Sequence, residues 1–181
     1  MAPSAQTTSS DVQELLKDAE LAGEWILDPS RSTVSLKSKS AGIPVNGVFR
    51  QVTGTGSVSA TGEVTGALVV AAASIDTKSA RRDNHLRSAD FFDVRNYPDI
   101  TFTVAGIRPS GPGVTVTGTL NVRDRAKPLT FDGTAAVHCA REVSVDAKVK
   151  INRADFGLTW NFLGAVSTNA AVTVRAVFTR R

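Results

Sequence analysis

The stretch "VTVTGTLNV" (residues 114–122) alternates apolar and polar side chains. Val114, Val116, Leu120 and Val122 fall on one side of an extended chain, and threonine and asparagine fall on the other. A β-strand has this period of two because successive side chains point to opposite faces. The stretch therefore predicts an antiparallel strand with one apolar face and one wet face.

The same alternation recurs along most of the chain after Trp25. It is clear in "STVSLK" (32–37), "VSVDAKVKI" (143–151) and "AVTVRAVF" (171–178), with turn-forming residues between such runs. No helical pattern is long enough for repeated crossovers between parallel strands. The pattern predicts an all-β fold of about eight strands, closed into an antiparallel barrel because closure removes exposed strand edges.

The N-terminal residues do not follow the alternating pattern. Apolar residues at helical spacing in 11–22, followed by Gly23, predict a short amphipathic helix. We therefore divide the chain into 1–23, a disordered start plus this helix, and 24–181, the barrel domain. We find no signal-peptide pattern and no apolar run long enough to cross a membrane. We expect a cytoplasmic protein without an integral membrane span.

Composition limits the function classes. The chain has 181 residues, a net charge of +4 and a single cysteine, so no intrachain disulfide can form. A basic surface can attract nucleic acid or anionic lipid, but it is more often only solvated. No strand interleaves aromatic with basic residues, so we expect no nucleic-acid partner.

The run "GALVVAAASI" (66–75) is apolar on both faces of its expected strand. One face can point into the barrel, and the other needs a cover. The N-terminal helix or a second subunit would provide it, and we expect a homodimer.

The interior of such a barrel is apolar. An eight-stranded barrel is either just filled by its own side chains or holds one ligand. A hydrocarbon chain suits this interior because its burial contributes about 0.8 kcal/mol per CH₂. An alkyl or isoprenoid chain would therefore be the natural guest of an open bore. The alternative is a filled barrel without a ligand, a structural or stress-related module that acts through protein–protein contacts.

The charged stretch "ARRDNHLRSADFFDVRNYPDITF" (80–102) interrupts the strands. Asp76 or Thr77 can cap a short helix that begins near Lys78, and Ser88 can start a second turn. We expect a helical insert near 78–92 that presents two phenylalanines to the bore. Charged side chains would hold this insert in place through charge-assisted hydrogen bonds. They are Arg82, Asp83, His85, Asp90 and Asp93.

The expected ligand contacts are the large apolar residues that face the bore. They are Val34, Leu36, Phe49, Leu68, Val70, Phe91, Phe92, Phe102, Val104, Leu120, Phe131, Phe156 and Trp160. The last two lie in "DFGLTWNFLGAVSTNA" (155–170), which is too apolar for a solvated loop. This segment covers the barrel end opposite the charged insert, lines the ligand entrance, or forms a satellite hydrophobic cluster.

The ionisable residues give no sign of catalysis. The aspartates around His85 lack a compact metal-ligand spacing, so we expect no metal and no other cofactor. His138 and Cys139 are adjacent in a strand and point to opposite faces, so they form no Cys–His pair. No nucleophile elbow or phosphate loop is present. We expect no enzymatic activity.

The charged stretch also carries a family resemblance. It contains S-I-D-T (74–77), R-D-x-H-L (82–86), S-x-D-F-F-D (88–93) and Y-P-x-I-x-F (97–102) in order. With V-x-G-x-F (45–49) and R-x-D-F-G (153–157), these motifs resemble the YceI-like family of lipocalin-like proteins across residues 24–180.

The resemblance implies an extended eight-stranded barrel with a helix, commonly dimeric. Some members of the family hold a polyisoprenoid or another long lipid chain in the bore. With the apolar pattern, the resemblance implies non-enzymatic binding, storage or transport of an isoprenoid, an isoprenoid quinone or a fatty-acid-like lipid. Two departures stand out. Many relatives carry an export signal, and many carry a histidine where this chain has Ser38-Lys39-Ser40.

Overall fold

The computed structural model describes residues 19–160 and 166–181. These residues form an 11-stranded sheet in the order β1-β4-β5-β7-β8-β9-β10-β11-β2-β3-β6, and β1 also pairs with β11. All of these pairings are antiparallel. The extra β1–β11 pairing closes the ring from β1 to β11 into an eight-stranded barrel, as the alternating pattern predicts.

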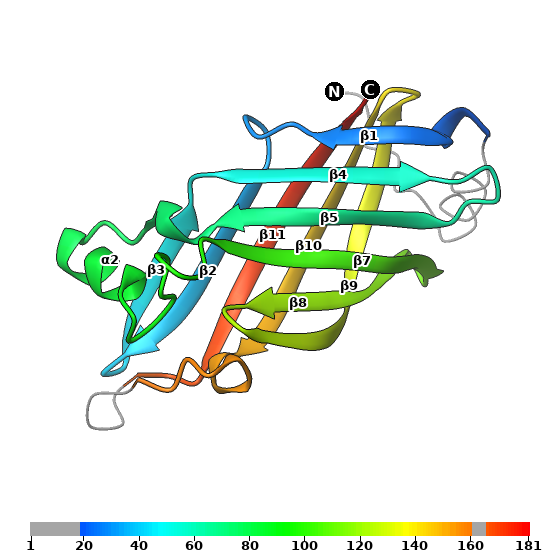
Figure 1. Ribbon diagram of the computed structural model, residues 1–181. Coiled ribbons are helices and arrows are strands. Elements are labelled where there is room, and N and C mark those ends of the chain that lie inside the picture. Colours follow the sequence, from blue (N-terminus) through cyan, green and yellow to red (C-terminus); the bar gives the residue numbers. More distant parts are fainter. Residues whose placement is uncertain (1–18, 161–165) are drawn as a thin grey trace, which may run out of the picture.

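The elements follow the chain with short connections. The strands are β1 (Gly23–Leu27), β2 (Thr33–Ser40), β3 (Ile43–Phe49), β4 (Val52–Val58), β5 (Val64–Ala71), β6 (Ile75–Asp76), β7 (Asp99–Ser110), β8 (Gly113–Val122), β9 (Arg125–Cys139), β10 (Glu142–Asn152) and β11 (Asn169–Arg180). The helical elements are η1 (Ala19–Leu21), η2 (Ala72–Ser74), α2 (Ala80–Arg87) and η3 (Arg153–Phe156). In Figure 1, β4, β5 and β7 cross in front of the steeply inclined β9, β10 and β11.

The predicted inward face of β8 is confirmed. Val114, Val116, Leu120 and Val122 are all buried. Burial of this face explains why the register is well defined, since a slip of one residue would turn every apolar side chain outward.

The expected continuous strand over 66–75 is wrong. It ends at Ala71, and Ala72–Ser74 form a 3₁₀ turn before β6. Inside the turn, the Ser74 hydroxyl donates to the Ala71 carbonyl at 2.6 Å. The turn carries the chain from β5 across to β3, where Ile75 pairs with Phe49 and is fully buried.

Close packing against β3 depends on a glycine. A Cβ at Gly47 would lie 3.0 Å from Ile75 Cδ1 and 3.2 Å from Thr77 Cγ2. A side chain at Gly47 would therefore crowd Ile75 and Thr77, in the segment from which the charged insert starts, and these side chains would have to shift by a few tenths of an ångström. This requirement gives a physical reason for the glycine in the V-x-G-x-F motif.

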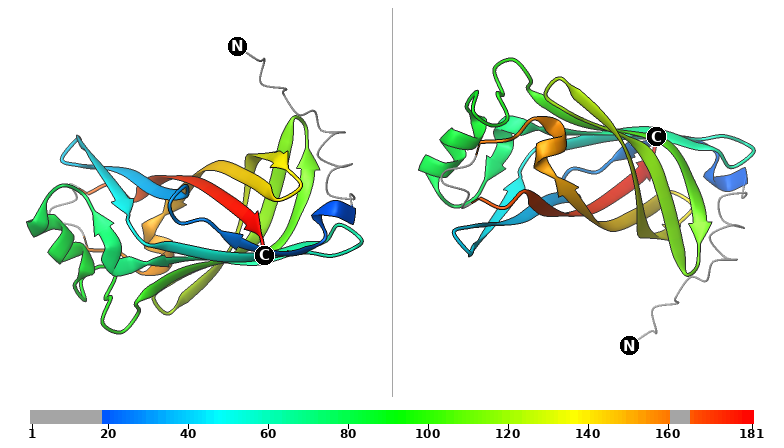
Figure 2. Two further views of the ribbon diagram at one scale, coloured as in Figure 1. Left: turned by 90° about the horizontal axis from the view of Figure 1, so that it is seen from above. Right: turned by 90° about the horizontal axis from the view of Figure 1, so that it is seen from below.

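The helix of the charged insert (residues 78–97) begins later than expected. The helix α2 starts at Ala80, and Ser79, not Asp76 or Thr77, is its N-cap, with Oγ accepting from the Arg82 N–H. Lys78 has φ +64°, a left-handed conformation that cannot continue into a helix. The helix ends at Arg87, short of the expected 92, and turns follow it. Figure 2 shows α2 at one end of the barrel in both views.

The expected N-terminal helix over 11–22 lies mostly outside the described residues. Its last part, Ala19–Leu21, forms one 3₁₀ turn. The Trp25 indole N–H donates to the Leu21 carbonyl at 3.0 Å, which fastens this turn to β1. Within the described ranges, no helix has the length and apolar character needed to cross a bilayer.

Candidate functional site

A large cavity lies inside the barrel. Its volume is about 1070 Å³, at the upper end of the roughly 300–1,000 Å³ typical of ligand pockets. The bore is therefore not filled by side chains. The thirteen positions expected to face a ligand all line this cavity: Val34, Leu36, Phe49, Leu68, Val70, Phe91, Phe92, Phe102, Val104, Leu120, Phe131, Phe156 and Trp160. That they contact a lipid remains a prediction.

Strand register brings the apolar lining together. Leu68 on β5 lies opposite Phe102 on β7, and Phe102 lies opposite Leu120 on β8. The rings of Phe102 and Phe131 are 5.4 Å apart between centroids. Inward-facing residues of successive strands thus form a continuous apolar wall across the barrel.

The charged insert adds two phenylalanines to this wall. The Phe92 N–H donates to the Leu86 carbonyl at 2.9 Å, so the turn after α2 folds back onto the helix. The Phe92 ring packs 6.1 Å from the Phe49 ring and 5.2 Å from the Phe91 ring. Phe92 is buried, and both phenylalanines line the cavity at this end.

Thr77 holds the start of the insert. The buried Asp83 accepts hydrogen bonds from the Thr77 N–H at 2.9 Å and from the Thr77 hydroxyl at 2.5 Å. Arg82 donates from Nε to the Thr77 hydroxyl at 2.8 Å and from Nη2 to the Thr77 carbonyl at 2.7 Å. Asp83 and Arg82 thus each bond to Thr77. A simple pairing of charges would instead have joined them to each other.

The remaining charges of the predicted set have weaker contacts. His85 lies 3.6 Å from Asp90, whose side chain is 64% exposed, and its ring packs 4.2 Å from the Trp160 ring. Asp93 accepts from the Asn96 amide at 2.9 Å. Arg82 and His85 line the cavity, whereas the three aspartates of the set do not. Among the described residues, no group of three potential metal ligands is present.

Two arginines that the sequence analysis did not single out also fasten the insert. Arg87 donates to the carbonyls of Ala73 at 2.8 Å and Ile75 at 3.0 Å. Arg123 donates to the Phe91 carbonyl at 3.1 Å. Backbone carbonyls have no sequence signature, so these contacts could not be foreseen from residue types.

Arg153 organises the end loop (residues 153–160 and 166–168). Its guanidinium donates to the carbonyls of Leu158, Trp160 (2.8 Å), Val166 (3.2 Å) and Ser167 (2.8 Å). Burial lowers the pKa of this guanidinium from its ordinary value, but an arginine stays protonated in proteins.

Arg153 also connects the end loop to the charged insert. Its guanidinium carbon lies 5.9 Å from the centre of the Phe91 ring. The one signal of Arg153 in the sequence is its place at the head of the R-x-D-F-G motif.

The end loop lines the cavity at the same end as the charged insert, since Trp160 packs on His85 and Arg153 on Phe91. The expectation that 155–170 covers the opposite barrel end is therefore wrong. Phe156 and Leu158 are buried, and both line the cavity beside Trp160. Gly157 has φ +72°, and a Cβ there would lie 3.2 Å from Arg125 Nε. The other apolar residues of this segment, Phe162 and Leu163, lie outside the described residues.

Sequence and structure comparisons agree with the fold. The model of the YceI-like domain matches residues 25–178. The protein named Protein YceI from Salmonella arizonae is 31% identical over 106 residues, which cover 56% of this chain and 55% of that protein. Protein YceI from Salmonella newport matches equally. The chain thus spans about half the length of the curated relatives it matches.

Solved structures show the same architecture. Burkholderia cenocepacia BcnA superposes with a TM-score of 0.76 at 24% identity, covering 83% of this chain and 98% of that one. A polyisoprenoid binding domain from Saccharophagus degradans, implicated in plant cell wall breakdown, has a TM-score of 0.69 at 20% identity, covering 87% and 98%.

Proposed function

The chain belongs to the YceI-like family, and on this premise we propose that it binds the hydrocarbon chain of one long-chain lipid inside the barrel. The lipid is of the isoprenoid, isoprenoid-quinone or fatty-acid type. The role is non-enzymatic storage or transport. The observation that carries the proposal is the cavity of about 1070 Å³ with its apolar wall. The Saccharophagus degradans domain, described as polyisoprenoid binding, supports the same ligand class.

The energetics favour a chain over a compact ligand. Each methylene that leaves water contributes up to about 0.8 kcal/mol. Affinity should therefore rise with chain length until the chain fills the cavity, and further units should then add nothing. A filled barrel that acts only through protein contacts would need a packed interior, which this chain does not have.

A lipid-binding assay tests this proposal. A series of isoprenoid alcohols of increasing length would compete with a fluorescent lipid probe. We expect tighter binding with each unit up to a plateau. A second series of fatty acids covers the other chain type. Absence of competition at every length in both series would refute the proposal.

Two neighbouring positions on β5 give a matched pair of variants. Leu68→Arg places a charge in the apolar wall and should abolish lipid uptake, because an unpaired charge is costly to bury. Val69→Arg, at the next position of the strand and outside the cavity wall, should leave uptake unchanged. Circular dichroism checks that both variants fold, and Leu68→Gln serves as the milder replacement if Leu68→Arg does not. Equal lipid uptake by the Leu68 and Val69 variants would contradict the proposed site.

A further inference from the structure

The lysine and arginine residues that line the cavity give it charge of one sign. They are Lys39, Arg81, Arg82 and Arg153. No aspartate or glutamate among the described residues lines the cavity. A wall of one charge sign is unexpected for a purely hydrocarbon guest, because a neutral chain needs no charge at all.

These basic residues gather at one end of the barrel. The Ser167 N–H donates to the Lys39 carbonyl at 2.9 Å, so the end of β2 meets the end loop. The Trp160 ring of the same loop packs on His85 of α2. Arg153 holds this loop through the Trp160 carbonyl. The end of β2, α2 and the end loop therefore surround one mouth of the cavity.

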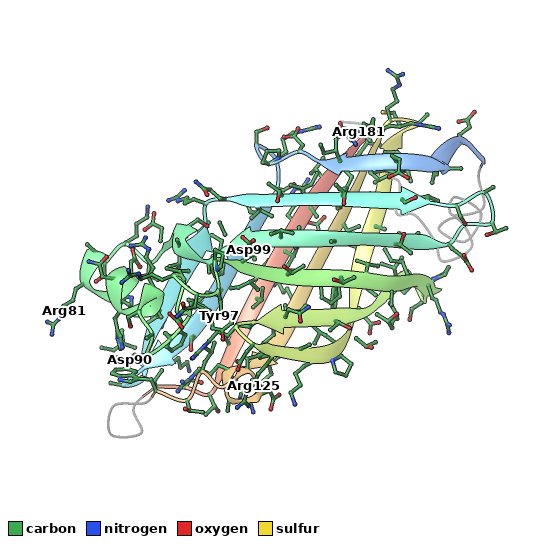
Figure 3. The ribbon with its side chains drawn as sticks, viewed as in Figure 1. Arg81, Asp90, Tyr97, Asp99, Arg125 and Arg181 are labelled. Carbon is green, nitrogen blue, oxygen red and sulfur yellow. The ribbon has the colours of Figure 1, made fainter. Side chains whose placement is uncertain are left out.

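Two of these cations stand at the rim and are not neutralised. Lys39 and Arg81 are exposed and form no ion pair with any described residue. Figure 3 shows Arg81 projecting outward from α2 at this end of the molecule. The nearby carboxylates have other partners: Asp83 bonds to Thr77, Asp76 bonds to Arg50, and Asp90 lies 3.6 Å from His85.

The first turn of α2 adds to this positive character. Ser79 and Arg82, at the beginning of the helix, line the cavity. The N-terminus of a helix carries partial positive charge, which favours an anion. In α2 the Arg82 N–H already donates to Ser79 Oγ, so the helix contributes through its dipole. Rim cations, a helix start and an apolar bore behind them together match an amphiphile with a negative head and a long tail.

We infer that the mouth recognises an anionic headgroup, a phosphate or a carboxylate, at the end of the bound hydrocarbon chain. This inference rests on the proposed function and narrows its ligand to single-chain anionic lipids. The tail lies in the apolar bore, and the head lies between the end of β2 and the start of α2. Lys39 and Arg81 supply the charge at the rim.

Three lipids with the same chain test the inference. Geranylgeranyl phosphate, geranylgeraniol and geranylgeranylamine would compete with a fluorescent lipid probe. We expect the phosphate to bind about tenfold more tightly than the alcohol, which corresponds to about 1.4 kcal/mol, and the amine to bind most weakly. Palmitic acid against palmitamide gives the same comparison for a carboxylate. The preference should shrink at high salt, because exposed charges are screened.

Paired double variants assign the preference to the mouth. Lys39→Gln with Arg81→Gln should bring the phosphate close to the affinity of the alcohol, while the affinity of the alcohol itself stays unchanged. Arg108→Gln with Lys148→Gln removes the same net charge from exposed positions outside the cavity wall. This control should keep the preference.

The outcomes separate this inference from the proposed function. Equal binding of alcohol and phosphate, or a preference that survives in the mouth variant, overturns the inference and leaves lipid binding standing. Failure of all lipids to bind overturns both. Inorganic phosphate should not displace the probe, and displacement by inorganic phosphate alone would show an anion site independent of the lipid, which also overturns the inference.

Discussion

Replacement of Arg153 by methionine should loosen the end loop and weaken the whole fold. The guanidinium donates to four carbonyls, those of Leu158, Trp160, Val166 and Ser167. Methionine has a similar volume and fills most of the space, although its side chain is shorter, and it donates no hydrogen bond. Arg153→Met therefore removes the hydrogen bonds with little loss of packing.

The size of the effect follows from the burial of the four acceptors. The carbonyl of Leu158 is buried and would lose its arginine donor, at a cost of about 1–3 kcal/mol. The other three bonds are partly buried, so water can replace the guanidinium at a smaller cost. We expect a total loss of about 2–4 kcal/mol, a large share of the roughly 5–15 kcal/mol that stabilises a typical domain.

Urea denaturation and amide hydrogen exchange measure the two parts of this prediction. The free energy of unfolding should fall by the amount above, and the Leu158 and Ser167 amides should exchange faster than in the wild type. A bound lipid probe should also dissociate faster. The control Arg175→Met removes an arginine on the outer face whose side chain is 53% exposed and lies 3.4 Å from Asp146. Its effect should stay within about 0.5 kcal/mol. A similarly small effect for Arg153→Met would refute the role assigned to this residue.

Two further predictions concern the charged insert. Asp83→Ala leaves the Thr77 N–H and hydroxyl without their acceptor. In urea denaturation it should lower the free energy of unfolding by about 1–3 kcal/mol, and it should speed exchange of a bound lipid probe. The control Asp90→Ala should be nearly neutral, and equal effects of the two variants would contradict the role of Asp83. The hydrogen bond from Arg50, followed by the bond from the backbone N–H of Lys78, lowers the pKa of Asp76 from 3.8 to about 2. A lowered pKa stabilises the folded state above pH 3.8, and this stability is lost as the pH falls through about 2. Asp76→Asn should therefore be less stable than the wild type at pH 7, and the difference should shrink in acid; a difference independent of pH would argue against this linkage.

The alternation of residue types was enough to predict the barrel and its wall. A residue such as Leu68 or Leu120 faces the bore because of the period of two, and the period can be read without any tertiary information. The helix in the insert was also predictable. Its start was not, because Asp76 and Thr77 are equally good capping residues by type, whereas the N-cap is Ser79. Lys78 has φ +64°, a left-handed conformation that separates Thr77 from the helix. The residue type of lysine does not predict this conformation.

The interactions that fix the ends of the barrel could not be read from the sequence. Arg87, Arg123 and Arg153 bind backbone carbonyls of distant residues, and a carbonyl is present at every position. The break at Ala72–Ser74 was missed because the run 66–75 is apolar throughout and carries no turn signal. The homodimer expected from this run stays a prediction, and light scattering of the purified protein would test it.

The central claim is that the cavity holds one long-chain lipid. Native mass spectrometry of the protein, purified without detergent and compared before and after organic extraction, tests it most directly. We expect a mass above that of the polypeptide by one long-chain lipid, which extraction removes and which appears in the extract. A mass equal to the polypeptide alone, both before extraction and after incubation with a lipid extract, would contradict the account.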